Sequence, residues 1–299
     1  MRIRPFQYYA PVSLNGALAK LAELGPDAKI LAGGTDLILS MKYKVNLPSW
    51  VIDLNKVEEL DFIEERGSRL HIGSLATHST ISKNKTLRNK APILCQAVSM
   101  IGSWQIRNVA TIGGNLCNAS PAADSAPPLL ALDARVIIAD VKGENEIPLR
   151  EFFTGPGVTA MQPNQLLKEI IIEQPGPWTA GCYLKLMRKK AVDLSVVGVA
   201  FQGVANESEG KLSRVAISLG GVAPTPIRSP GAEAVLNGLE YREALKALPD
   251  AAQAAVADTS PIDDIRASAE YRKAVVNAYV KRAGAYVISA LMEKGGERT

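Results

Sequence analysis

Two double-glycine stretches organise this chain, and the first reads Ala32-Gly33-Gly34-Thr35-Asp36. It follows the short apolar run 29–32, which predicts a β-strand ending at the glycines. The second stretch reads Thr111-Ile112-Gly113-Gly114-Asn115. Glycine permits positive φ and lets the backbone approach a ligand closely, so successive N–H groups can surround an anion such as a pyrophosphate. A single glycine turn usually serves only the end of its strand, and the presence of a pair shifts the balance modestly towards a phosphate-binding site.

Neither stretch matches the common nucleotide-binding patterns. The chain contains no Gly-x-Gly-x-x-Gly sequence and no phosphate loop ending in Gly-Lys-Ser/Thr. A Rossmann or P-loop site is therefore not expected, and any nucleotide must bind by another geometry.

The residues around the first glycine turn predict a small βαβ-like unit over residues 1–55. Apolar residues recur at helical spacing over 14–24, and Gly25-Pro26 ends this helix. The strand 29–32 follows, and a second strand is expected at 50–54.

A second α/β section is expected over residues 56–177. Its expected elements are short strands from residue 70 onward, a helix around 93–100, a turn-rich stretch at 108–125, and strands at 135–141 and 167–172. Gln174-Pro175-Gly176-Pro177 is typical of a linker, so we expect a domain boundary there.

The last section, residues 178–299, is expected to be an α+β domain. Three strands at 182–188, 195–204 and 212–222 indicate an antiparallel sheet, with a polar turn at 206–210 joining the last two. A long helix follows, with a predicted apolar stripe formed by Val275, Ala278, Tyr279, Ala283, Tyr286, Val287 and Leu291.

Composition indicates an ordered globular protein. The chain has 299 residues, of which 47% are hydrophobic and 21% charged, enough apolar material for real cores. Its formal charge of +4 comes from 34 basic and 30 acidic residues spread along the chain, so nucleic acid is not the expected partner. Arg2 and Arg4 precede no apolar segment of signal-peptide length, and no stretch approaches a membrane span, so a cytoplasmic location is expected.

The cysteines and histidines suggest no metal site. Cys95, Cys117 and Cys182 are far apart and form no Cys-x-x-Cys pair, so buried free thiols are expected rather than a disulfide framework or an iron-sulfur site. His71 and His78 lie seven residues apart in one segment, and structural roles are expected for both.

Five stretches, in order along nearly the whole chain, carry a family resemblance. They are 30–36, 106–115, Ala119-Ser120-Pro121-Ala122-Ala123-Asp124, Tyr183-x-Lys185-x-x-Arg188 with Asp193, and Ala269-Glu270-Tyr271-Arg272. Together they resemble the FAD-binding (medium) subunits of the xanthine dehydrogenase and carbon monoxide dehydrogenase family of molybdenum hydroxylases. The resemblance implies an α/β plus α+β protein: a vanillyl-alcohol-oxidase-type fold whose two parts bind FAD, followed by a domain of a three-stranded antiparallel sheet with helices that covers the flavin.

The same resemblance implies the cofactor-binding residues. These are Ala32, Gly33, Gly34, Thr35, Asp36, Thr111, Gly114, Asn115, Ala123, Asp124, Lys185 and Leu194. Both glycine stretches would contact the FAD pyrophosphate.

Three of these residues receive individual roles from the resemblance. Asp124 would bind ribose hydroxyls, although it could instead cap a helix before Pro127-Pro128. Lys185 would reach the isoalloxazine ring, where a cation stabilises the anionic reduced flavin, although it could instead be a solvated strand lysine. Leu194 would lie beside the ring, and its aliphatic side chain favours the xanthine dehydrogenase branch.

The function implied is electron transfer. The chain would take electrons from a partner iron-sulfur subunit and pass them to NAD or another acceptor, while a molybdenum-cofactor subunit oxidises the substrate. The assembly implied is a heterotrimer that often doubles. Two alternatives stay open: a self-sufficient flavin oxidase or reductase of the same fold, and a non-catalytic nucleotide-binding assembly module.

Overall fold

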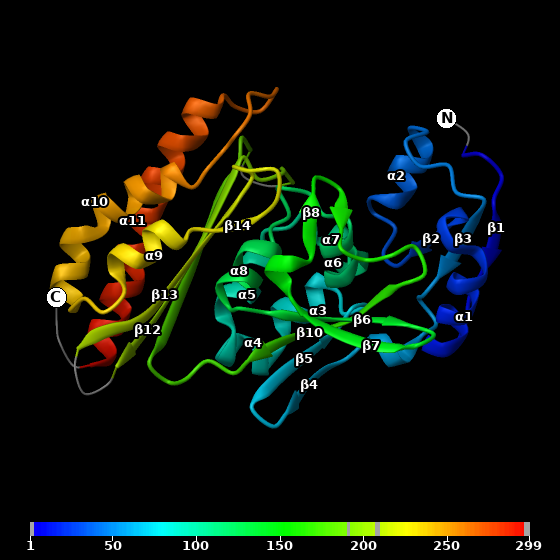
Figure 1. The fold of residues 1–299 in the computed structure, drawn as a ribbon, viewed down its shortest axis with the longest axis horizontal. Coiled ribbons are helices and arrows are strands. Elements are labelled where there is room, and N and C mark those ends of the chain that lie inside the picture. The colour runs from blue at the N-terminus through cyan, green and yellow to red at the C-terminus, as the bar shows by residue number, and fades with distance from the viewer. Residues whose placement is uncertain (1–2, 190–191, 207–209, 296–299) are drawn as a thin grey trace. The chain divides into compact units, whose positions relative to one another are not determined.

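The computed structural model describes residues 3–189, 192–206 and 210–295 (Figure 1). The chain folds into two compact units, each assembled from three separate segments. Unit 1 contains Met1–Ile81, Ser103–Ala119 and Ala134–Glu173. Unit 2 contains Ser82–Gly102, Ser120–Asp133 and Gln174–Thr299.

The first sheet of unit 1 has three parallel strands, in the order β1 (Gln7–Tyr9), β3 (Trp50–Asp53) and β2 (Ala28–Leu31). Helix α1 (Leu14–Leu24) connects β1 to β2 and begins at Ser13, whose side chain accepts a hydrogen bond from the Gly16 N–H. Leu18 and Leu21 on its buried face pack in one apolar cluster with Ile52 of β3. The predicted βαβ-like unit and its helix are confirmed.

The second sheet of unit 1 is antiparallel, with five strands in the order β4 (Ile63–Arg66), β5 (Arg69–Gly73), β10 (Leu166–Glu173), β6 (Arg135–Asp140) and β7 (Gly143–Pro148). Alternation of buried and exposed residues is weak in β10, because it lies at the centre of the sheet. The remaining elements of this unit are η1 (Gly25–Asp27), α2 (Leu37–Lys42), η2 (Glu58–Leu60), α6 (Trp104–Val109), α7 (Ile112–Cys117), η3 (Leu149–Glu151), β8 (Phe153–Gly155), β9 (Val158–Thr159) and the first residues of α3 (His78–Lys83).

The stretch 108–125, which was predicted to be rich in turns, contains a helix, so that prediction is wrong over part of its length. Helix α7 lies inside it. Two successive glycines give this segment low intrinsic helix propensity, and the sequence pattern therefore indicates a turn. The helix forms because the Thr111 side chain accepts the N–H of Gly114 at its start and because Gly113 packs tightly against Ser74.

Unit 2 is built on an antiparallel sheet in the order β11 (Thr179–Leu186), β12 (Val197–Asn206), β13 (Lys211–Gly220) and β14 (Ile227–Arg228). The three predicted strands are present within a few residues of their expected ends. The sheet has four strands rather than three, because a two-residue strand is too short to produce a recognisable alternation. Of the predicted polar turn at 206–210, residues 207–209 lie outside the described residues.

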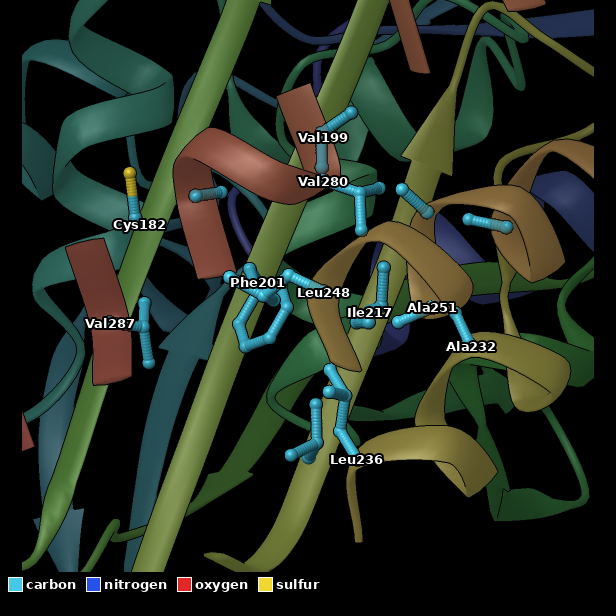
Figure 2. Close-up of a cluster of buried hydrophobic side chains, with 14 of the residues drawn as sticks. Cys182, Val199, Phe201, Ile217, Ala232, Leu236, Leu248, Ala251, Val280 and Val287 are labelled. Atoms are coloured by element: carbon cyan, nitrogen blue, oxygen red, sulfur yellow. The ribbon is translucent and has the colours of Figure 1, made fainter. Parts of the chain in front are cut away.

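Helices α9 (Pro230–Leu236), α10 (Tyr241–Ala257) and α11 (Ala269–Lys294) cover one face of this sheet (Figure 1). Figure 2 shows how Phe201 of β12 lies among Leu248 of α10 and Val280 and Val287 of α11. The predicted stripe on α11 is partly wrong, because Tyr286 is exposed. Four members of the predicted stripe are buried, namely Val275, Ala283, Val287 and Leu291, and the buried face also includes Val276, Val280 and Ile288, which were not predicted.

Shorter helices complete unit 2. They are α4 (Lys85–Lys90), α5 (Pro92–Ser99) and α8 (Ala126–Ala131). Helix α5 packs on β11, and α8 packs on β12 and β13. Among the residues that the structure describes, no helix is both long enough and apolar enough to cross a membrane.

Candidate functional site

The first glycine turn presents a run of backbone donors in unit 1. Gly34 has a φ of +70°, a conformation that residues with a Cβ rarely adopt. The N–H groups of residues 33–36 donate to no group in the described part of the chain. Successive unpaired N–H groups around a residue of positive φ form a concave anion-binding surface. The turn therefore fits the pyrophosphate of FAD.

Gly33 is required by packing as well. A Cβ at this position would lie 2.0 Å from the backbone oxygen of Val109 and 2.9 Å from the Cα of Ala110. Only glycine allows such an approach. The segment that leads into the second glycine stretch therefore rests directly on the first.

Side chains at the ends of the first turn fix its shape. Asn55, just beyond β3, donates from its Nδ2 to the Ala32 oxygen at 3.1 Å and to Asp53 Oδ1 at 2.6 Å. Asp36 lies at the start of α2 without capping it. Burial raises the pKa of the Asp36 carboxyl.

The second glycine stretch is the first turn of helix α7. Thr111 Oγ1 accepts the N–H of Gly114 at 3.1 Å, and the Asn115 N–H donates to the Thr111 oxygen at 3.0 Å. A Cβ on Gly113 would lie 2.6 Å from the Cβ of Ser74. Neither glycine of this stretch has positive φ. Glycine suits such a turn because it allows positive φ and close approach of other atoms. Of the four glycines in the two stretches, only Gly34 has positive φ.

His78 lies beside this stretch in unit 1. Its backbone N–H donates to the Ala110 oxygen at 3.0 Å, and the preceding Thr77 forms an isolated β-bridge with Thr111. The His78 side chain is fully buried, and neither ring nitrogen has a hydrogen-bond partner among the described residues. Burial, assisted by the positive charge of Arg107, lowers the pKa of His78 to about 4. The imidazole is therefore neutral at physiological pH.

The site residues of unit 2 form a buried polar cluster around Asp124. Tyr183 and Ser195 both donate their hydroxyl hydrogens to Asp124 Oδ1, at 2.8 and 2.6 Å. Lys185 Nζ donates to Asp124 Oδ2 at 2.8 Å and to the backbone oxygen of Met100 at 3.0 Å. The side chains of Lys185 and Asp124 are only 1% and 6% exposed. We call Asp124, Tyr183, Lys185 and Ser195 the Asp124 cluster.

The alternation of strand β11 explains part of this arrangement. Tyr183 and Lys185 are two residues apart, so both side chains point to the same face, opposite Cys182, which joins the core below the helices. Lys185 pairs with Gly198 on β12. A Cβ on Gly198 would lie 2.6 Å from the Tyr183 hydroxyl oxygen, so the glycine leaves the space in which the phenol reaches Asp124.

The cluster overturns two of the alternatives left open by the sequence. Lys185 is not a solvated strand lysine, because its side chain is buried and ion-paired. Asp124 does not cap helix α8, which begins after Ser125 without a side-chain cap. Ala123, the residue before it, is buried, and its N–H donates to the Ser120 oxygen.

Leu194 lies in a loop at the edge of the cluster, and 54% of the residue is exposed. The flanking Asp193 accepts the N–H groups of Arg188 and Lys189, and Ser195 is tied to Asp124. An exposed apolar side chain on a loop held at both sides is suited to contact a flat apolar surface, which is the role expected of Leu194.

Sequence reasoning assigned no function to the two hydroxyl groups. Tyr183 stands within the motif Tyr-x-Lys, whose spacing could have placed it beside Lys185 on one face of a strand. Ser195 carries no comparable signal. The three cysteines are free, and burial raises the pKa of Cys117 to about 12.

Comparisons with known proteins identify the family. Residues 4–175 match the family described as "FAD binding domain in molybdopterin dehydrogenase", and residues 182–287 match "CO dehydrogenase flavoprotein C-terminal domain". The carbon monoxide dehydrogenase medium chain of Hydrogenophaga pseudoflava is 34% identical over 93% of this chain and 95% of its own length. The xanthine dehydrogenase FAD-binding subunit of Escherichia coli O157:H7 is 32% identical over 95% and 96%. These identities do not favour the xanthine dehydrogenase branch that Leu194 suggested.

Solved structures agree with these matches. Carbon monoxide dehydrogenase from Hydrogenophaga pseudoflava superposes with a TM-score of 0.91 at 34% identity, covering 97% of this chain and 99% of that one. Quinoline 2-oxidoreductase from Pseudomonas putida 86 gives a TM-score of 0.90 at 26% identity, covering 98% and 100%. The chain belongs to the family of FAD-binding subunits of molybdenum hydroxylases, and it is the FAD-dependent oxidoreductase component of such an enzyme.

Proposed function

We propose that this chain takes electrons from a partner iron-sulfur subunit and passes them to NAD or another acceptor, while a partner molybdenum subunit oxidises the substrate. The assembly would be a heterotrimer that can pair with a second copy. Membership of the family supports this proposal, because matched relatives bear names such as "medium chain" and "FAD-binding subunit". FAD, when bound, supplies the ability to accept electrons singly and to give them up as a pair.

The observation that supports FAD binding best is the run of N–H groups in the first glycine turn. The N–H groups of residues 33–36 point to no acceptor in the described part of the chain, and a pyrophosphate would satisfy them. By the family resemblance, Thr111, Gly114 and Asn115 would contact the same group. Backbone donors hold such an anion without adding side-chain charges that would alter the flavin potential.

The contacts of the Asp124 cluster support a role for Asp124 in binding a ribose hydroxyl and a role for Lys185 in stabilising the reduced flavin. Three hydrogen bonds to the Asp124 carboxylate leave room for one more donor, such as a ribose hydroxyl, because a carboxylate has about four acceptor positions. Lys185 uses two of its three N–H donors. Since the Lys185 side chain is 1% exposed, we propose that it affects the flavin mainly through the electrostatic field of its positive charge, rather than by a direct hydrogen bond.

Anaerobic reduction of the flavin tests the proposed function. The chain would be purified with its FAD and mixed with candidate hydroxylase substrates, such as a purine or an aldehyde, first alone and then with the partner subunits restored. We expect the flavin absorbance to bleach only when the partners are present. Bleaching by such a substrate without partners would refute the subunit role and support a self-sufficient oxidase. A colourless protein that takes up no FAD would support the assembly-module alternative.

The acceptor is identified by the reverse experiment. Dithionite-reduced chain would be mixed with NAD, a quinone or a ferredoxin in a stopped-flow instrument. The acceptor that reoxidises the flavin fastest is expected to be the physiological class. Failure of NAD alone would correct the acceptor and leave the FAD assignment intact.

A further inference from the structure

The two hydroxyl groups of the Asp124 cluster converge on one atom. Tyr183 is fully buried and Ser195 is 1% exposed, and both donate to Asp124 Oδ1, whereas Lys185 donates to Oδ2. Buried hydrogen bonds to a charged group are stronger than neutral ones, and buried donors left unpaired are costly. The two carboxylate oxygens are thus assigned to different partners, hydroxyls on one side and the ammonium on the other.

From this arrangement we infer that Tyr183 and Ser195 are positioning residues that set how strongly the positive charge of Lys185 acts on the flavin. The inference rests on the proposed function. The hydroxyls draw negative charge density towards Oδ1, away from the ammonium on Oδ2. Without them, Asp124 neutralises Lys185 more completely, and the anionic reduced flavin receives less stabilisation.

The rest of unit 2 holds both hydroxyls in place before any cofactor binds. The Tyr183 N–H donates to Gln96 Oε1 of helix α5 at 2.9 Å. Both backbone polar groups of Val196, the residue after Ser195, are hydrogen-bonded: its N–H donates to the Leu186 oxygen, and its oxygen accepts a hydrogen bond from Arg272 Nη1. Arg272 belongs to the last of the five sequence stretches, which therefore acquires a role in holding this loop.

Variants with opposite expected signs test the inference. Tyr183→Phe and Ser195→Ala each remove one donor from Asp124, so the midpoint potential of the bound flavin is expected to become more negative. Asp124→Asn removes the negative charge and leaves Lys185 uncompensated, so the potential is expected to become more positive. Ser195→Thr keeps a hydroxyl at this position, so its flavin potential is expected to equal that of the wild type, in contrast to Ser195→Ala. A purely structural role predicts neither opposite signs nor rescue.

Two matched controls separate the cluster from general effects of hydroxyl removal. Ser218 of β13 is fully buried, and its hydroxyl donates to the Pro127 oxygen rather than to Asp124. Tyr279 of α11 is partly buried, and it lies outside the cluster. Ser218→Ala and Tyr279→Phe are expected to leave the flavin potential unchanged. The inference is overturned if the controls shift the potential as much as Tyr183→Phe and Ser195→Ala do, or if those two variants do not shift it.

A measurement on the FAD-free protein tests the contacts independently of the cofactor. Urea unfolding of Tyr183→Phe, Asp124→Asn and the double variant forms a mutant cycle. Tyr183→Phe changes the unfolding equilibrium constant by some factor. We expect that factor to be at least about fivefold smaller when Asp124 has already been replaced by Asn, since the Tyr183 hydroxyl then has no charged acceptor to lose. Coupling in this cycle with an unchanged flavin potential would reduce Tyr183 to a structural role and overturn the inference. Wild-type protein that binds no FAD would instead overturn the proposed function.

Discussion

His78 makes unit 1 sensitive to acid, and its replacement offers a quantitative test of the structure. The side chain is fully buried, and both ring nitrogens lack partners among the described residues. Burial is the main cause that lowers its pKa from 6.5 to about 4, with Arg107 adding repulsion. The folded protein therefore keeps His78 neutral at pH values where the unfolded chain has already bound a proton.

The sign of the effect follows from proton binding. Above pH 6.5 both states are neutral at this residue, and His78 makes no pH-dependent contribution. Between pH 6.5 and about 4 the unfolded state binds more protons than the folded state, so stability falls as the pH is lowered. At about 1.36 kcal/mol for each unit of pKa difference, the total loss is about 3.4 kcal/mol. For a domain of ordinary stability this is a large fraction.

The assay compares the wild type with His78→Leu and His78→Gln by urea unfolding at several pH values between 7.5 and 4. Tryptophan fluorescence reports on both units, because Trp50 and Trp104 lie in unit 1 and Trp178 lies in unit 2. As the pH falls from 7.5 to 4, the unfolding free energy of both variants should rise by about 3 kcal/mol relative to that of the wild type, since neither replacement side chain titrates. At pH 7.5 the glutamine variant should be the less stable of the two, because its amide is buried without a partner.

The comparison removes the contribution of other acidic groups, which titrate equally in all three proteins. A stability difference between wild type and His78→Leu that stays constant within about 1 kcal/mol from pH 7.5 to 4 would contradict a buried neutral His78. An NMR titration of the ring protons provides the direct check. A His78 pKa near 6.5 in the folded protein would refute the argument at its first step.

Three further predictions concern the cofactor and the Asp124 cluster. FAD should leave the protein on acid precipitation, because burial raises the pKa of Cys117 to about 12 and keeps it from acting as a thiolate that bonds to the flavin; yellow precipitate would contradict this. Gly114→Val should weaken FAD binding at least about a hundredfold, measured by flavin fluorescence, because a branched side chain at the helix start occupies space needed by the pyrophosphate; Gly176→Val, with open space around its Cβ, is the control. Lys185→Met should make the flavin harder to reduce, and it should lower the free energy of unfolding by about 3–5 kcal/mol because Asp124 is left buried without its ion pair. In the double variant Lys185→Met/Asp124→Asn the loss of unfolding free energy should be smaller than the sum of the two single losses. Additive losses would contradict the ion pair.

Local elements were predictable where their start and end signals lie in the sequence itself. Helix α1 begins at a serine cap, repeats apolar residues at helical spacing and ends at Gly25-Pro26, so all its determinants are local. Helix α7 was missed because its glycines oppose helix formation and its stability comes from Thr111 and from packing against Ser74. Helix α10 was missed as well, and Pro249 in its interior weakens the helical signal.

The Asp124 cluster was only half predictable. Asp124 and Lys185 were assigned from the family resemblance, which indicates which residues matter but not which atoms they contact. Asp124 and Ser195 are 71 positions apart in the sequence, and no local pattern encodes such a pairing. The spacing of Tyr183 and Lys185 does encode a shared face of a strand, but the phenol has room to reach Asp124 because Gly198, which lies opposite Lys185 on β12, carries no side chain next to the Tyr183 hydroxyl.

The glycines of the two stretches differ in what the structure requires of them. Gly33 and Gly113 are both required because backbone or Cβ atoms of other segments lie within 3 Å of where their Cβ would be, and this requirement exists without any ligand. Gly34 differs, because it has positive φ and the N–H groups of residues 33–36 donate to no group among the described residues. A buried or half-buried turn normally pairs such groups, since an unpaired donor costs about 1–3 kcal/mol. The N–H groups around Gly34, which have no acceptor in the part of the chain that the structure describes, are therefore a better ground for proposing an anion site at the first turn than the glycines as such.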